Sequence, residues 1–201
     1  MARSDLDTIK EHFGNRPFRV KEAVDAGIAR HIIYRLRDEG ALQTLSRGVM
    51  QPVDSDPAMN TEFAALAARV PKGTICLNTG LSFWELSDEL PHSIDLAVPR
   101  GSHWPMIDTP TTTLHRFSAE TFDLERISQS TEAGEPFWIY SAERCIVDAM
   151  RLAHIVGRDV ALSALSRYAR RKRPEPQRLV ALARRLGGAR QMRDALELIL
   201  A

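Results

Sequence analysis

Apolar residues recur at helical spacing through the first forty residues, and short β-prone runs then replace that spacing. The positions of Leu6, Ile9 and Phe13 predict a first helix, which a Gly-Asn pair ends. Two further helices are predicted over residues 18–26 and 29–39. The first forty residues are therefore predicted to form three short helices.

Two short strands are predicted next, over residues 42–45 and 49–51. Gly48 stands in the turn between them, and glycine suits the positive φ that a tight hairpin requires. The turn-rich, acidic stretch 52–57 follows, and we interpret it as a domain boundary. The first domain is therefore predicted at residues 1–56.

The remainder, residues 57–201, mixes both periodicities and ends in several helices. Helices are predicted over residues 60–70, 78–86, 142–155, 158–171, 175–187 and 190–200. Strands are predicted over residues 74–77, 94–98, 111–117, 127–131 and 137–140. The expected core contains Leu66, Leu81, Trp84, Leu96, Val98, Leu114, Trp138, Ile146, Leu165 and Leu182. The expected fold class is α+β, with a small N-terminal domain and a larger α+β domain.

Residues 19–38 fit the frame of a helix-turn-helix motif. The frame requires a small residue where the helices cross and a residue tolerant of left-handed φ four positions later, which are Ala23 and Gly27. Glu22 departs from the frame, because an apolar residue is usual there. The inner face of the second helix is apolar and contains Ile28, Ile33 and Leu36.

The outward face of that second helix is rich in hydrogen-bond donors, which suits the acceptors and phosphates of a DNA major groove. A helix-turn-helix followed by a hairpin with an arginine at its tip is typical of a winged helix. The predicted DNA contacts of this domain are Arg19, Lys21, Arg30, His31, Tyr34, Arg35 and, at the hairpin tip, Arg47. The alternative is a three-helix piece of an ordinary domain with a surface hairpin.

The charge of the chain is segmented, although its formal net charge is only +1 over 201 residues. Counting Arg and Lys against Asp and Glu gives +2 for residues 1–50, −8 for 51–142 and +7 for 143–201. Such asymmetry indicates a polyanionic partner that touches part of the surface. A solvated, arginine-rich helical face is the alternative.

A basic cluster in the last segment is a second candidate for DNA contact. Helical spacing predicts Arg167, Arg170 and Arg171 on one face, and Arg173 completes the candidate contacts. Two alternatives remain: contact with an acidic partner or with the acidic middle segment, and a plain solvated surface.

Catalytic chemistry is not evident in the sequence. The chain lacks the spaced metal-binding carboxylates of a nuclease or nucleotidyltransferase, and it has no phosphate-cradling Gly-rich loop. Arg144 and Asp148 stand four apart on a predicted helix, where an ion pair is expected rather than catalysis. We therefore expect no catalytic residue, no metal, no cofactor and no enzymatic activity.

The composition, 44% hydrophobic and 26% charged, is that of a globular protein. No run of about 18 apolar residues predicts a membrane span, and the first residues show no secretion signal. Two cysteines, Cys76 and Cys145, are too few for a disulfide framework. A cytoplasmic setting without membrane contact is expected.

An ordered set of motifs resembles the AbiEi-type antitoxins of bacterial type IV toxin–antitoxin systems. The resemblance covers nearly the whole chain. It rests on Ala26-Gly27, Leu36–Gly40, Leu45–Met50, Val70–Cys76, Leu81–Leu86, Leu96–Gly101 and Tyr140–Asp148. Arg47-Gly48 falls on the wing of that family, and Arg144 and Asp148 fall on its late helix; Met50 stands where the family often has tyrosine.

The resemblance implies an N-terminal winged helix that binds double-stranded operator DNA, expected to carry inverted repeats, and represses its own operon. It also implies a C-terminal domain, residues 57–201, that neutralises a co-encoded nucleotidyltransferase-like toxin and can add DNA contacts. One alternative is a free-standing winged-helix regulator without a toxin. Another is a nucleic-acid-processing enzyme, against which the missing metal carboxylates argue.

Overall fold

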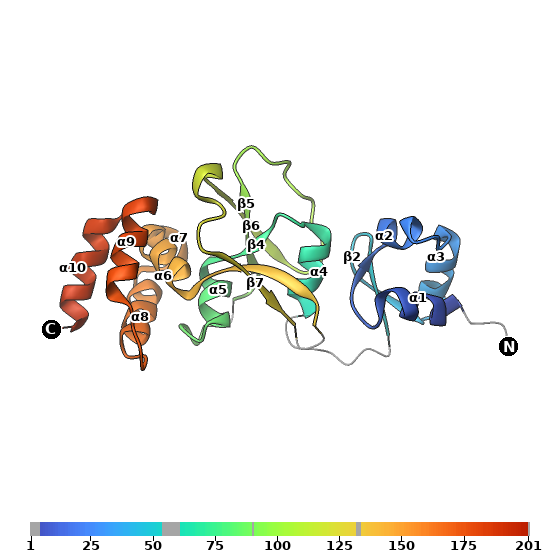
Figure 1. Ribbon diagram of the computed structural model, residues 1–201, viewed down its shortest axis with the longest axis horizontal. Helices are drawn as coiled ribbons and strands as arrows, with labels where there is room; N and C mark the ends of the chain where they lie inside the picture. The colour runs from blue at the N-terminus through green and yellow to red at the C-terminus, as the bar shows by residue number, and fades with distance from the viewer. Residues whose placement is uncertain (1–4, 54–60, 90, 132–133, 201) are drawn as a thin grey trace. The chain divides into compact units, whose positions relative to one another are not determined.

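The computed structural model describes residues 5–53, 61–89, 91–131 and 134–200, and these form an α+β fold with two sheets (Figure 1). The predicted fold class is confirmed. The chain divides into two compact units, which comprise Met1–Gly73, His103–Thr112 and Ser128–Trp138 in the first and Thr74–Ser102, Thr113–Ile127 and Ile139–Ala201 in the second. The boundary expected after residue 56 lies in the stretch 54–60, outside the described residues.

The first unit begins with three helices and a three-stranded antiparallel sheet of order β1-β3-β2. Its elements are α1 (Asp5–Phe13), β1 (Phe18–Arg19), α2 (Val20–Asp25), α3 (Arg30–Asp38), β2 (Leu42–Ser46) and β3 (Val49–Pro52). The predicted hairpin strands are confirmed. The prediction that the second helix begins at Phe18 is wrong, because Phe18 and Arg19 pair with Met50 and Val49 of β3.

A small core holds these elements together. Ile9, Phe18, Ala23 and Ile33 have no exposed surface, and the rings of Phe13 and Phe18 stack with centroids 4.7 Å apart. Burying each large apolar side chain contributes about 1.5–3 kcal/mol. The predicted inner face of the third helix is therefore confirmed, and it fixes which residues of α3 face outward.

The second sheet has the strand order β6-β5-β4-β8-β7, with β4 antiparallel to β5 and parallel to β8. Its strands are β4 (Thr74–Ile75), β5 (Ile94–Pro99), β6 (Thr112–Phe117), β7 (Arg126–Ser130) and β8 (Pro136–Tyr140). The associated helices are α4 (Thr61–Arg69), α5 (Leu77–Phe83) and the 3-10 turn η1 (Ala119–Thr121). A strand is present at each of the five predicted places, but the one predicted over 74–77 ends at Ile75, because Cys76 is the N-cap of α5 and Leu77 begins that helix.

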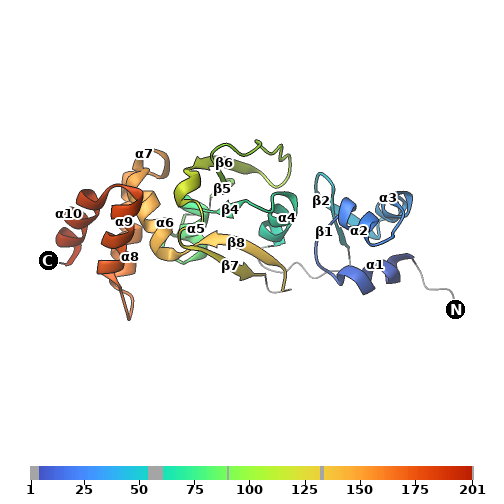
Figure 2. The same cartoon turned by 45° about the horizontal axis from the view of Figure 1, so that its top comes forward.

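The second unit ends in a group of helices that pack on α6, as the two views show (Figures 1 and 2). They are α6 (Ala142–Arg151), α7 (Ala153–Val156), α8 (Arg158–Ala169), α9 (Pro176–Leu186) and α10 (Ala189–Leu200). The helix predicted over 142–155 is interrupted at Leu152, whose φ of −110° and ψ of 34° leave the helical region. Nearly every residue of α6 is buried, so α6 is the central element of this core.

Most of the predicted core residues are buried, and one is not. Trp138 is 37% exposed, because the alternation along β8 turns Phe137 and Ile139 inward and Trp138 outward. Trp84 and Leu114 are half-buried. None of the helices in the described ranges combines the length and apolar character of a membrane span.

Candidate nucleic-acid interface

The turn between α2 and α3 has the geometry that the sequence frame requires. Gly27 adopts a φ of +90°, which a residue without Cβ tolerates best. The Ile28 N–H donates to the Ala23 carbonyl at 2.9 Å, and the Gly27 N–H donates to Val24 at 3.0 Å. Ala23 is fully buried at the crossing, so the two helices lie close together and their angle is fixed by packing.

Glu22, the one residue that departs from the frame, closes the start of α2. One carboxylate oxygen accepts from the Arg19 backbone N–H at 3.4 Å, and the other accepts from the Arg16 guanidinium at 2.5 Å. A carboxylate in the first turn also complements the helix dipole. Glu22 therefore departs from the frame for a structural reason, because its carboxylate caps the start of α2 where an apolar side chain would make a packing contact.

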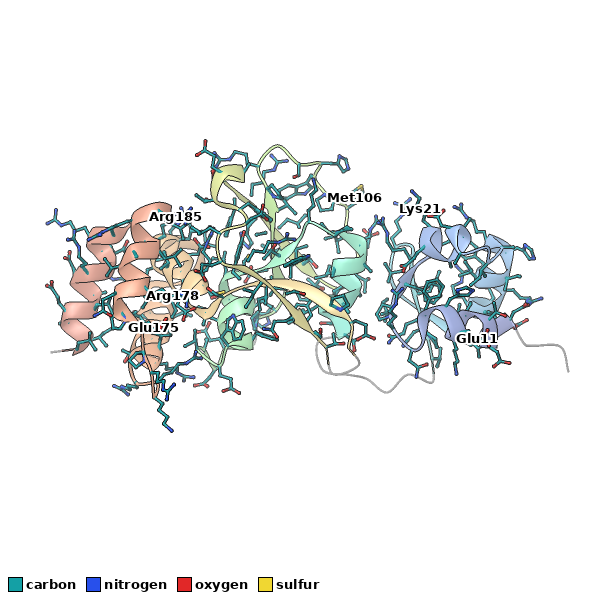
Figure 3. All side chains as sticks on the ribbon, in the orientation of Figure 1. Glu11, Lys21, Met106, Glu175, Arg178 and Arg185 are labelled. Carbon is teal, nitrogen blue, oxygen red and sulfur yellow. The ribbon has the colours of Figure 1, made fainter. Side chains whose placement is uncertain are left out.

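Three basic side chains near the turn point into solvent. Lys21, Arg30 and His31 are exposed, and Lys21 extends away from α2 (Figure 3). None of the three makes a hydrogen bond or ion pair within the part of the chain that the structure describes. Their donors are therefore available to an external partner.

The other two predicted contacts on α3 are engaged within the protein. The Arg35 guanidinium pairs with the carboxylate of Asp5 and lies 3.6 Å from that of Glu39. Tyr34 is half-buried against the core, and the Arg37 guanidinium lies 4.9 Å from the centre of its ring. On the outward face of α3, the side chains of Arg30 and His31 are therefore free to bind a partner, whereas that of Arg35 is already paired within the protein.

The hairpin after α3 presents one arginine. Arg47 is exposed, and Gly48 beside it has the expected positive φ, +76°. The Gly48 carbonyl accepts from the Val20 N–H at 2.9 Å, which ties the hairpin turn to the start of α2. Arg19 is half-buried in β1, so it offers less of its side chain than Arg47 does.

The basic cluster of the second unit is not on one helical face. Helix α8 ends at Ala169, two residues before the predicted end, and Arg170 is its C-cap. The Arg171 N–H donates to the Tyr168 carbonyl at 3.0 Å, and Pro174 cannot extend the helix. Arg170 and Arg173 are exposed and have no ion pair within the described ranges.

Two other arginines of this cluster are held by the protein itself. Arg167 forms a two-pronged pair with Asp88, a residue of the acidic middle segment, with one N–O distance of 2.8 Å. Its guanidinium holds the pKa of that carboxyl below the usual range. The Arg171 guanidinium donates to the Trp84 carbonyl and lies 5.8 Å from the Tyr168 ring centre. Arg167 and Arg171 therefore brace the second unit.

The predicted pair of Arg144 and Asp148 is present and fully buried. The Arg144 Nε lies 2.6 Å from an Asp148 oxygen, and neither side chain has more than 1% exposure. Arg144 also donates to the carbonyls of Thr121 and Leu124, each at 2.9 Å, and lies over the Tyr140 ring. Burial raises the pKa of the Asp148 carboxyl, and the Arg144 guanidinium opposes that rise. This arrangement joins α6 to the segment before β7.

One buried polar network was not anticipated from the sequence. The His115 Nε2 lies 2.8 Å from an Asp95 oxygen, and the Thr79 hydroxyl accepts from the Asp95 N–H at 2.8 Å. That hydroxyl also donates to the Ser93 carbonyl, so it is not aligned with the imidazole as a nucleophile would be. The network links α5, β5 and β6. Within the described residues no group of three or more His, Cys, Asp or Glu side chains is arranged to hold a metal ion.

Comparison with known proteins gives a structural relationship without a sequence family. No family model matches the chain, and no curated protein matches it either. The crystal structure of the RV2827C protein from Mycobacterium tuberculosis is similar, with a TM-score of 0.57 at 16% sequence identity. The match covers 95% of this chain and 75% of that one. At this identity the likeness concerns the fold alone: the α+β fold of this chain also occurs in a solved bacterial protein.

Proposed function

We propose that this protein is a transcriptional repressor that binds double-stranded operator DNA through a winged helix-turn-helix in residues 1–56. The observation that carries the proposal is the pairing of α2 and α3 around Gly27, with Arg30 and His31 exposed at the start of α3. In this docking mode the beginning of the second helix enters the major groove, and the hairpin contacts the neighbouring groove or backbone.

Two further features support DNA as the partner. Ala29, the N-cap of α3, has no side-chain acceptor for the leading N–H groups of that helix, which suits a phosphate oxygen there. Lys21 and Arg47 add donors on the elements that flank α3. The proposal assigns the protein no catalytic activity.

The experiment is a fluorescence-anisotropy titration of the full chain on DNA from upstream of its own gene. Replacing both Arg30 and Arg47 with alanine should weaken specific binding at least tenfold, since one good arginine–base contact is worth about 1–3 kcal/mol. Arg184→Ala is the matched control, because it removes one exposed arginine from α9, outside the proposed interface. Equal affinities of wild type and the folded double variant would refute the docking.

The antitoxin part of the proposal rests on the resemblance of the motifs to AbiEi-type antitoxins. We propose that residues 57–201 neutralise a co-encoded nucleotidyltransferase-like toxin in the cytoplasm, while residues 1–56 serve repression. The second unit has an extensive buried core, which is compatible with a binding or regulatory role.

Co-expression with the neighbouring open reading frame tests this part. The full chain should restore growth when that frame encodes a toxin, and the Arg30→Ala, Arg47→Ala variant should restore it too, provided an inducible promoter replaces autoregulation. Loss of rescue in that variant at equal protein level would overturn the division of labour. Normal operator binding without any adjacent toxin would favour the free-standing regulator.

A further inference from the structure

A groove of about 560 Å³ lies at the helical end of the second unit, where α10 meets α6, α7 and α8. Its floor is apolar and built largely from small side chains, namely Ala153, Ala161 and Ala195 with Met150 and Leu162. Small residues leave room for a large side chain from outside. Arg158, Arg190 and Asp194 stand at its polar rim.

A protruding leucine stands at the border of the same groove. Leu198 of α10 lines the groove and is 79% exposed, the highest value among the exposed large hydrophobic residues of the described chain. Burying a large apolar side chain so exposed is favourable, because it removes apolar surface from water. Its own groove cannot bury it, because Leu198 belongs to the wall.

The charges along this face of α10 run from basic to acidic. Arg190, near the N-terminal end, is 91% exposed and lines the groove, and Asp194 lines it one turn later, whereas the exposed Arg193 and Glu197 are not among the groove residues. Arg190 and Asp194 are 3.9 Å apart within the helix, a separation that leaves both side chains open to other partners. Two copies of α10 that approach in antiparallel orientation would place each Arg190 near Asp194 of the other copy.

We infer that this face is the contact between two copies of this chain, with the two α10 helices antiparallel and Leu198 of each copy filling the groove of the other. A two-fold interface uses the same patch twice, so knob and groove must lie on one surface, as they do here. The inference does not depend on DNA binding. It would nevertheless supply the two-fold symmetry with which a repressor reads inverted repeats.

Sedimentation velocity of the full chain over a range of concentrations tests the interface. The wild type should approach twice the chain mass of 22.5 kDa as concentration rises, whereas Leu198→Asp should stay at one chain mass. The matched control is Leu200→Asp, because Leu200 is exposed on the same helix but does not line the groove. A wild type that remains monomeric, or a Leu198→Asp variant that dimerises as the wild type does, would overturn the inference.

A charge exchange tests the antiparallel pairing itself. Arg190→Glu and Asp194→Arg, each alone, should weaken self-association by about tenfold or more, because each creates like-charge contacts on both sides of the two-fold axis. A mixture of the two variants should associate like the wild type, since Glu then faces Arg across the interface. Failure of the mixture to associate, with both variants folded, would exclude this arrangement.

Discussion

Arg144 is a charged residue without exposed surface, and groups from three segments compensate it. Asp148 supplies the opposite charge, the carbonyls of Thr121 and Leu124 accept hydrogen bonds from Arg144 Nη1, and Tyr140 supplies a ring face. Because these groups are in place, the cost of burying the charge is offset only while all of them remain. Arg190 and Asp194 on α10 are the opposite case: both are exposed, and their attraction is screened by water.

Asp148→Ala should therefore lower the free energy of unfolding by about 3–5 kcal/mol, because it leaves Arg144 buried without its counter-charge. The double change Arg144→Met, Asp148→Leu should cost less than Asp148→Ala alone, since no buried charge remains. Urea denaturation followed by circular dichroism measures both. Glu175→Ala, which removes an exposed partner of Arg178, is the surface control and should cost less than about 0.5 kcal/mol. A cost for Asp148→Ala as small as that of the control would contradict this account of the buried pair.

The residues of the outward face of α3 differ in how free they are to bind DNA. Sequence spacing predicted that Arg30, His31 and Arg35 face outward, and all three are exposed. It could not predict that Asp5, thirty residues earlier, pairs with Arg35, because that contact depends on how α1 packs against α3. Nor could spacing predict that Tyr34 is half-buried.

Because Asp5 and Glu39 compete with DNA for Arg35, we expect Arg35→Ala to weaken operator binding by less than about 1 kcal/mol, below the roughly 1–3 kcal/mol expected of an uncompensated base contact. Asp5→Asn should strengthen binding, since it frees the guanidinium and removes a negative charge. Anisotropy titrations at one fixed salt concentration compare the two variants. Weaker binding by Asp5→Asn would show that the pair orients Arg35 for DNA.

At the scale of elements, α5 and α6 approach each other closely in the second unit. A Cβ placed on Gly80 would lie 2.5 Å from the Cys145 sulfur, far inside van der Waals contact. Helical periodicity predicted both helices, but it could not reveal this contact between residues 65 positions apart. The two wrong helix boundaries also depend on contacts that sequence spacing does not show. Residues expected to begin α2 pair with β3 and form β1 instead. Helix α8 ends earlier than predicted, where the Arg171 N–H bonds to the Tyr168 carbonyl and Pro174 follows.

Gly80→Ala should destabilise the second unit by about 1–3 kcal/mol through overpacking. Cys145→Ala removes the clashing sulfur, and the nearest remaining atom, the Cβ at residue 145, is at an ordinary 3.7 Å. The double variant should therefore be more stable than the sum of the two single effects predicts. Thermal unfolding of the four proteins closes this cycle, and strict additivity would show that the helices separate at no cost.

At the scale of the whole molecule, part of the segmented charge seen in the sequence is neutralised by ion pairs within the protein. Arg167 reaches Asp88, and Arg178 reaches Glu125 at 2.7 Å, so basic residues of the last segment pair with acidic residues of the middle one. Figure 3 labels Arg178 and Glu175, which also form an ion pair. Within the basic cluster, Arg170, Lys172 and Arg173 in the loop between α8 and α9 are exposed and remain open to a polyanion.

If these two arginines contact phosphates, replacing both with alanine should lower the slope of log affinity against log salt by about two units, close to one per contact. The loss should be about equal for operator and unrelated DNA. Titrations of the full chain at several salt concentrations measure the slope. An unchanged slope would assign the loop to solvent or to a protein partner.

The reaction rate of the two cysteines with a thiol reagent can measure how often the core of the second unit opens. Cys76 and Cys145 both belong to the second unit, both are buried, and burial raises the pKa of each thiol. Because thiol reagents attack the thiolate, labelling must await transient opening of that core, and its rate reports how often the core opens. The first unit contains no cysteine, so thiol labelling does not report on it directly. A ligand that binds the helical end of the second unit will therefore slow the labelling of both thiols.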